Sequence, residues 1–263
     1  MTETLEKKIN RFIEFNKAMI TAAVSTNNLE NQGVHAKILL CSIIDSLAKS
    51  RFPDKKTNGT RFQQTVKTSA NWLDCDRISL LHLKRAIEIE QQNDVQFADL
   101  NTWAEDVISR NFATSESDLS ARIDIAKDPM PEDVLALWPH DEMNQPIKLG
   151  GSSWDKLTHK NLLWQYRNSL MHEYRIPGRA LEYNVKTSIP FYQQISQIDE
   201  GCLSTGLIFT NSWELLYPTG FFQIVAENTL EGVAAYHKSA QTCPFAAYSD
   251  GSFWIPKFND KYE

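Results

Sequence analysis

Arg167, Asn168 and His172 stand close together in the segment YRNSLMHEYR, which spans residues 166–175. An imidazole can move a proton near neutral pH, and a guanidinium can hold the negative charge of a phosphate. Together these two groups can support cleavage of an RNA strand without a metal ion. Asn168 could orient His172 or a phosphate oxygen. The segment therefore predicts phosphodiester chemistry, with Arg167, Asn168 and His172 as the candidate catalytic residues.

The spacing of these residues sets a geometric condition on such a site. Asn168 and His172 are four positions apart and share one face of a helix. Arg167 and His172 are five positions apart, which is about 140° around an ideal helix. One helix alone is therefore a poor catalytic site. Two copies facing each other across a twofold axis would line a shared cleft with Arg167 and His172 of both chains, so a homodimer is part of the hypothesis.

An arginine followed by a histidine four to six residues later is a weak pattern. The chain has 10 arginines and six histidines, and Arg77 with His82 fits the pattern as well. Because aliphatic residues surround that second pair, we interpret it as structural, at the edge of a packed helix. The first segment also has a structural interpretation, as a solvated helix face on which Glu173 pairs with a nearby arginine. Such an ion pair contributes little to stability at a surface. From the residues alone, both the catalytic and the structural interpretation stay open.

The order of residues in the segment, Arg-Asn-x-x-x-His, resembles the RNxxxH signature of the HEPN superfamily of α-helical ribonucleases. Two further parts are similar to uncharacterised bacterial and plasmid-borne HEPN-like proteins. One is an early helix with the sequence LCSIIDSLA, residues 40–48, followed by Arg-Phe-Pro. The other is the sequence YPTGFF, residues 217–222, which follows a hairpin and leads into a closing helix. The resemblance covers residues 31–237, except the middle loop.

The resemblance implies a metal-independent RNA endonuclease that is usually dimeric and often a toxin or a phage-defence effector. It assigns His172 as general base on a ribose 2′-hydroxyl, or as acid on the leaving 5′-oxygen. Arg167 would hold the phosphate, and Asn168 would orient His172 or a phosphate oxygen. The products would be a 2′,3′-cyclic phosphate and a 5′-hydroxyl. The alternative is a catalytically silent HEPN-like module for dimerisation, or for binding a nucleotide, RNA or a partner protein.

Glu173, Arg175 and Asp45 are supporting candidates. Asp45 could orient a residue of the site, but we favour its interpretation as a helix-stabilising carboxylate. The implied partners are RNA, a second copy of the chain and an antitoxin or regulatory protein. Neither a cofactor nor a metal is implied.

The charge of the chain limits how it could bind RNA. The net charge is −6, which argues against broad, charge-driven binding of nucleic acid. A small basic patch remains possible near the motif, where Lys160, Arg167, Arg175 and Arg179 lie close together in the sequence. We therefore expect a local site and not an extended basic face.

The composition predicts a soluble protein of the cytoplasm. Apolar residues make up 42% of the 263 residues and charged residues 23%, and no apolar run is long enough to span a bilayer. The first ten residues are polar and charged, unlike a signal peptide. The four cysteines, Cys41, Cys75, Cys202 and Cys243, are widely spaced, so we expect reduced thiols and neither disulfides nor a zinc site.

Hydrophobic periodicity predicts a mainly α fold. Apolar residues recur every three or four positions in seven segments, which are residues 4–24, 31–51, 60–73, 76–92, 100–110, 153–175 and 221–237. Asp76 is the expected N-cap of the fourth segment. Residues 112–152 are rich in proline, aspartate, serine and glycine, and predict a long irregular connection with short helical turns near residues 132–138.

A change of period to two predicts a β-hairpin in residues 187–217, with its turn at residues 199–201. Residues 244–263 form a C-terminal tail with a second small hairpin near residues 249–252. Since an isolated amphipathic helix is marginal in water, the helices must pack together. The expected fold is a single helical-bundle domain of residues 1–263, HEPN-like, with a small β-hairpin insertion before the last helix.

Overall fold

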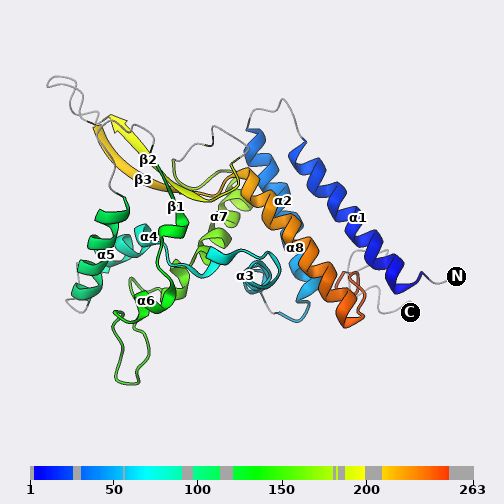
Figure 1. Ribbon diagram of the computed structural model, residues 1–263, viewed down its shortest axis with the longest axis horizontal. Helices are drawn as coiled ribbons and strands as arrows, with labels where there is room; N and C mark the ends of the chain where they lie inside the picture. The colour runs from blue at the N-terminus through cyan, green and yellow to red at the C-terminus, as the bar shows by residue number, and fades with distance from the viewer. Residues whose placement is uncertain are drawn as a thin grey trace. The chain divides into compact units, whose positions relative to one another are not determined.

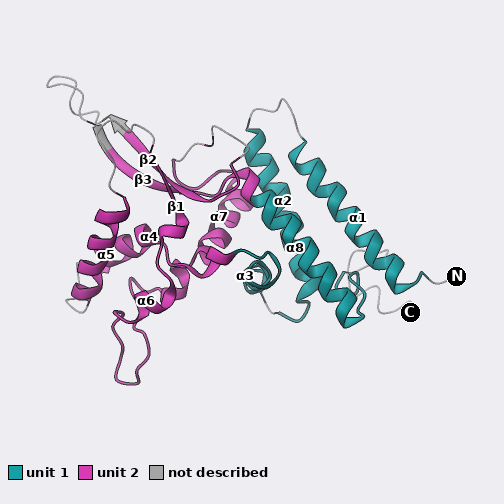
Figure 2. Cartoon of the chain, viewed as in Figure 1, with its two compact units in different colours: residues 1–72, 222–263 teal, residues 73–221 magenta. Residues whose placement is uncertain are grey.

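Figure 1 shows a computed structural model of the chain, which describes residues 3–25, 31–55, 57–90, 97–112, 121–179, 182, 187–198 and 209–248. The chain divides into two compact units (Figure 2). Unit 1 comprises residues 1–72 and 222–263, and unit 2 comprises residues 73–221. Compact units of this kind can belong to one folding domain, so the single domain stays a prediction.

Unit 1 is helical in the part that the structure describes. Its helices are α1 (Leu5–Val24), α2 (Gln32–Arg51), α3 (Asn58–Ser69) and most of α8 (Thr219–Ala240). α1 begins where the sequence predicts, because the Thr4 side chain accepts a hydrogen bond from the Lys7 amide. The apolar stripe of this helix is buried at Ile9, Phe12 and Ile20. The helices of unit 1 thus bury the faces that their hydrophobic periodicity marks.

Gly232 lies at a close approach between α8 and α3. A Cβ atom at this position would lie 2.6 Å from the backbone oxygen of Ser69 and 2.9 Å from its Cα. Backbone atoms cannot turn aside as a flexible side chain can. We therefore expect Gly232→Ala to destabilise the protein by roughly 1–3 kcal/mol, despite alanine's better helix propensity. Urea unfolding measures this, and exposed Glu231→Ala is the control, with a change of about 0.5 kcal/mol or less. Equal unfolding midpoints for the two variants would contradict the steric argument.

Unit 2 combines helices with a small sheet. Its α-helices are α4 (Leu80–Glu90), α5 (Ala98–Asn111), α6 (Pro131–Leu135) and α7 (His159–Glu173). The strands are β1 (Arg122–Asp124), β2 (Phe191–Ile198) and β3 (Phe209–Leu216), antiparallel in the order β1-β2-β3. The register pairs Phe191 with Asp124 on one side and with Leu216 on the other. A core of α4, α5 and α6 residues includes Leu83, Ile87, Phe97 and Val134.

The mainly α fold with a small antiparallel hairpin before the last helix is confirmed. β1 is a third strand that the sequence did not indicate, because three residues are too few to set a period of two. The described part of the expected irregular connection is ordered by burial of Ile125, Val134, Trp138 and Leu149. The helical turn expected there is α6. The predicted hairpin turn at 199–201, the predicted tail hairpin at 249–252 and Cys202 lie outside the described residues.

Two expected helix starts are wrong. Asp76 is not the N-cap of α4, because it ends a 3₁₀ turn, Leu73–Asp76, and α4 begins only at Leu80. The motif helix begins at His159 and not near residue 153, since a separate 3₁₀ turn, Trp154–Leu157, precedes it. Among the described helices, none is both long and apolar enough to cross a bilayer.

Candidate functional site

α7 carries the motif and is fixed at both ends. Thr158 is extended and serves as its N-cap residue, and His159, the first residue of the helix, is fully buried. At the other end Tyr174 adopts a left-handed conformation with φ of 55°, which stops the helix. The motif residues therefore occupy the last two turns of a helix that is anchored by its first residue.

Arg167 is packed along the side of α7. Its side chain is 9% exposed, and its Cζ lies 4.9 Å from the centroid of the Trp164 ring. Its Nη1 donates a hydrogen bond of 3.2 Å to Oδ1 of Asn168. Asn168 lies between Arg167 and His172 around the helix, about 100° from the first and 40° from the second. The hydrogen bond thus turns the guanidinium toward the side of α7 that carries His172.

His172 is exposed in the last turn of α7, as is Glu173 after it. Glu173 and Arg175 form an ion pair of 2.6 Å between Oε2 and Nε, with side chains 49% and 65% exposed. A pair so open to water contributes little to stability. The imidazole of His172 is therefore reachable by a large ligand such as RNA, and its two charged neighbours are occupied by each other.

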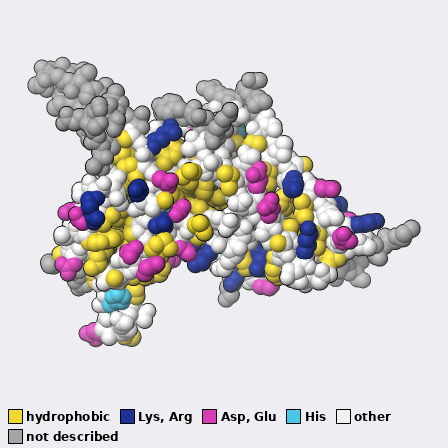
Figure 3. All heavy atoms as spheres, in the orientation of Figure 1, with side chains coloured by type: hydrophobic (Ala, Val, Ile, Leu, Met, Phe, Trp, Pro, Cys, Tyr) yellow, Lys and Arg dark blue, Asp and Glu magenta, His cyan; other side chains and the backbone are white. Residues whose placement is uncertain are grey.

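Two of the four basic residues near the motif lie at different ends of α7 and pair with different carboxylates. Lys160 binds Asp76 in the first turn of α7, while Arg175 pairs beyond its last turn. Lys160 and Glu173, the last helical residue and the partner of Arg175, are 13 residues apart, which is about 20 Å along α7. On the face drawn in Figure 3, basic and acidic side chains are interspersed. Asp45, the third supporting candidate, is half-buried in α2 of unit 1, while the motif belongs to unit 2.

A buried polar network around Asp128 is the most notable feature of unit 2 that the sequence did not reveal. Oδ2 of Asp128 accepts hydrogen bonds from the Tyr192 hydroxyl and from Nε2 of His159, the latter at 2.7 Å. Oδ1 accepts from the Leu80 amide at 3.1 Å. Nδ1 of His159 lies 2.9 Å from the Tyr217 hydroxyl. Because the Asp128 and His159 side chains are fully buried, this pair must satisfy its charges and hydrogen bonds internally.

The same network determines which nitrogen of His82 carries a hydrogen. Each hydroxyl has only one hydrogen to donate. Tyr192 donates to Asp128, so Ser79, 2.7 Å from the Tyr192 oxygen, donates to Tyr192. Oγ of Ser79 then accepts from Nδ1 of His82 at 2.8 Å. His82 therefore holds its hydrogen on Nδ1 and keeps a lone pair on Nε2.

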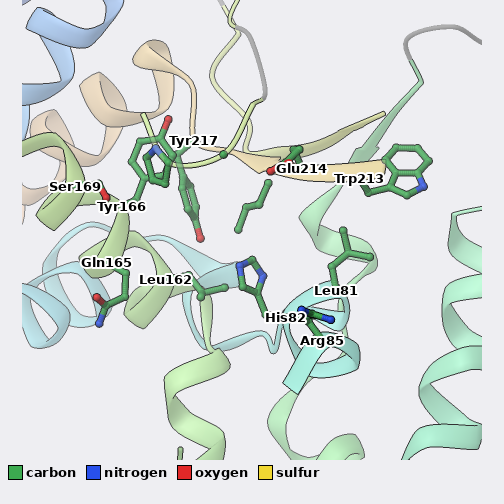
Figure 4. Close-up of a pocket in the computed structure, with 13 residues that line it drawn as sticks. Leu81, His82, Arg85, Leu162, Gln165, Tyr166, Ser169, Trp213, Glu214 and Tyr217 are labelled. Atoms are coloured by element: carbon green, nitrogen blue, oxygen red, sulfur yellow. The ribbon is translucent and has the colours of Figure 1, made fainter. Parts of the chain in front are cut away.

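His82 also lines a cavity of about 390 Å³ within unit 2. The walls come from α4, α7, β3 and the turn after α7. Figure 4 shows His82 beside Leu162, with Tyr217 and Glu214 across the cavity. Crowding by protein atoms, followed by the nearby His159, lowers the pKa of His82, against the opposing effect of Asp128. The imidazole is thus neutral near pH 7 although its side chain opens into the cavity.

Sequence reasoning interpreted His82 as a structural residue, and that interpretation missed its place in the cavity. The only local signal was Ser79, three residues earlier at the start of α4, where a hydroxyl can bond the next turn. No local spacing pointed to Asp128, because its partners Tyr192 and His159 are distant in the chain.

Tyr192, the buried tyrosine of this network, should make the stability of the protein fall at alkaline pH. Burial, and then the negative charge of Asp128, raise the pKa of Tyr192 well above 10. The unfolded chain therefore releases this proton first, and stability should fall as pH rises above about 10. Tyr192→Phe should weaken this fall, and exposed Tyr174→Phe should leave it unchanged. Urea unfolding from about pH 8 to about pH 11 measures both slopes. Parallel slopes for wild type and Tyr192→Phe would contradict the prediction.

Comparison with known protein families, with curated proteins and with solved structures gave no match. Within the described ranges, no group of three or more histidine, cysteine, aspartate or glutamate side chains is arranged to hold a metal ion. The functional argument therefore depends on the motif of α7 and on the cavity.

Proposed function

We propose that this chain is a metal-independent RNA endonuclease of the HEPN type that acts as a homodimer, in the role of a toxin or phage-defence effector. The observation that carries the proposal is the arrangement on α7. His172 is exposed at the end of the helix, and Asn168 draws the Arg167 guanidinium toward the same side. An antitoxin or regulatory protein would restrain such an activity in the cell.

The proposed reaction is an internal transfer that needs no water in its first step. His172 takes the proton of a ribose 2′-hydroxyl, and the 2′-oxygen forms a bond to the adjacent phosphorus. The bond from phosphorus to the 5′-oxygen breaks, and that oxygen receives a proton from solvent, to which His172 later returns the proton that it took. Arg167 holds the non-bridging oxygens, where its planar fork can bind two of them as charge develops.

A second copy of the chain is needed because of where Arg167 lies. Arg167 is about 140° around the helix from His172, and its guanidinium packs on the ring of Trp164. Within one chain, the hydrogen bond to Asn168 reduces this separation, but the two residues still leave the helix on sides that are about 140° apart. Two α7 helices related by a twofold axis can place Arg167 of one copy beside His172 of the other.

The experiment is RNA cleavage by purified protein in excess EDTA. We expect cleavage with fragments that end in a 2′,3′-cyclic phosphate and begin with a 5′-hydroxyl. An RNA with a 2′-deoxy sugar at the cleaved position should resist, because it lacks the attacking oxygen. Cleavage of the deoxy substrate, or products with a 5′-phosphate, would contradict the mechanism.

The silent binding module is the second candidate, and the packing of Arg167 on Trp164 favours it. A guanidinium that is 9% exposed could serve stability alone. A module of this kind would retain RNA without cutting it, and His172→Ala would not change the retention. Gel-shift and cleavage assays on the same samples distinguish the two candidates.

A further inference from the structure

The cavity of unit 2 carries polar side chains that make no hydrogen bond to the part of the chain that the structure describes. Gln165 and Ser169 on α7 and Glu214 on β3 line it, and their side chains make no hydrogen bond within the described ranges of the chain. Polar groups of a folded protein that converge on a cavity without partners are typical of a ligand site. These three side chains come from two elements, so the fold and not the local sequence brings them together.

The carboxylate of Glu214 lies close to the backbone of Gly178 at one wall of the cavity. A Cβ atom at Gly178 would lie 2.5 Å from Oε2 of Glu214, and the backbone there has a φ of 78°. Glycine is the residue that permits both this backbone conformation and this close approach. The Glu214 carboxylate is thus a hydrogen-bond acceptor with two oxygens and no donor among the described residues.

A second hydrogen-bond acceptor, Nε2 of His82, lies across the cavity from Glu214. Nε2 of His82 keeps its lone pair because Ser79 accepts the hydrogen on Nδ1. The lining also includes one cation, Arg85. Its side chain is 72% exposed and pairs with Glu88 over 3.3 Å, so turning the guanidinium to a ligand costs little free energy. The remaining walls, at Leu81, Leu162, Leu215 and Tyr217, are apolar or aromatic.

We propose that this cavity, with Glu214 and Arg85 as its recognition groups, binds a guanine base. The guanine edge has two adjacent donors, N1–H and N2–H, which suit a carboxylate with both oxygens free. Its O6 and N7 are acceptors for Arg85 and for the hydroxyl of Ser169. The apolar walls suit the flat faces of a purine, and a volume of about 390 Å³ accommodates a nucleobase.

Other bases fit these groups less well. Adenine and cytosine offer one amino group beside a ring nitrogen that is itself an acceptor, so a carboxylate would meet a lone pair. Uracil has one N–H between two carbonyl oxygens. Guanine alone among the four presents two neighbouring donors to Glu214. The inference is independent of the proposed nuclease activity, because binding at this cavity does not require cleavage at α7.

The test is isothermal titration of the full chain with guanosine, inosine and adenosine 5′-monophosphates. We expect affinity in the order guanosine, inosine, adenosine, since inosine lacks the N2 amino group. Glu214→Gln should weaken guanosine monophosphate binding by roughly 10-fold to 100-fold. The matched control is Glu142→Gln, an exposed glutamate of unit 2 outside the cavity, which should bind like wild type.

A parallel titration identifies the source of the base. It uses two RNA pentamers, UUGUU and UUAUU. Preference for the guanine pentamer with weak mononucleotide binding would indicate a base within an RNA strand, and strong mononucleotide binding would indicate a free nucleotide. Both outcomes support the site if Glu214→Gln reduces them. No preference for guanine in either format, or a preference that Glu214→Gln does not alter, would overturn the inference whether or not the protein cleaves RNA.

Discussion

His172→Ala should slow metal-free RNA cleavage by roughly 100-fold to 10,000-fold, the usual contribution of a general acid or base. The change removes the imidazole to which we assign the proton transfer. This imidazole lies on the exposed side of the last turn of α7. Because the side chain is exposed, its loss leaves no cavity in the core. Initial rates with a labelled RNA in EDTA measure the effect, and circular dichroism checks the fold.

The matched control for this variant is His140→Ala. His140 is also exposed and belongs to unit 2, but it lies in the loop after α6, away from the motif. The His140→Ala variant should cleave RNA at the wild-type rate. Equal rates for wild type and both variants would mean that cleavage comes from another site or from a contaminant.

Asp128→Ala should cause the largest loss of stability, about 3–5 kcal/mol. Asp128 accepts from Tyr192, His159 and the Leu80 amide, so its removal leaves three buried donors without their acceptor. Each such group keeps the full cost of being taken out of water. The start of α4, the first residue of α7 and strand β2 would lose their common attachment.

The free energy of unfolding in urea measures this loss. Asp133→Ala is the control, because Asp133 is exposed in the first turn of α6 and contributes only its interaction with the helix dipole, about 1 kcal/mol or less. A similar, small loss for both variants would mean that unit 2 does not depend on the Asp128 network.

The elements that the sequence predicted well are those with long periodic patterns. α1 keeps its expected bounds because Thr4 caps it and its apolar residues recur over 20 residues. The hairpin of β2 and β3 followed from alternation over eight residues in each strand. β1 and the 3₁₀ turns were missed, because elements of three or four residues have no period to detect.

The site was harder to predict, for two physical reasons. Asp128 is 31 residues from His159 and 64 from Tyr192, so no local spacing connects them. Charges that are close in sequence can also be far apart in space, as Lys160 and Arg175 are at opposite ends of α7. The interpretation of His82 as a packed helix residue depended on its aliphatic neighbours. Ile78, Leu80 and Leu83 are indeed buried in the core, but Leu81 and His82 itself line a cavity.

The most direct test of the proposed site mixes two inactive variants, Arg167→Ala and His172→Ala, and compares the mixture with wild type on the same RNA in EDTA. If Arg167 of one copy acts with His172 of the other, each mixed dimer has one intact site. Random pairing should then restore roughly a quarter of the wild-type rate, with cyclic-phosphate ends. A mixture as inactive as its two components beside an active wild type, or no cleavage by wild type itself, would contradict the account.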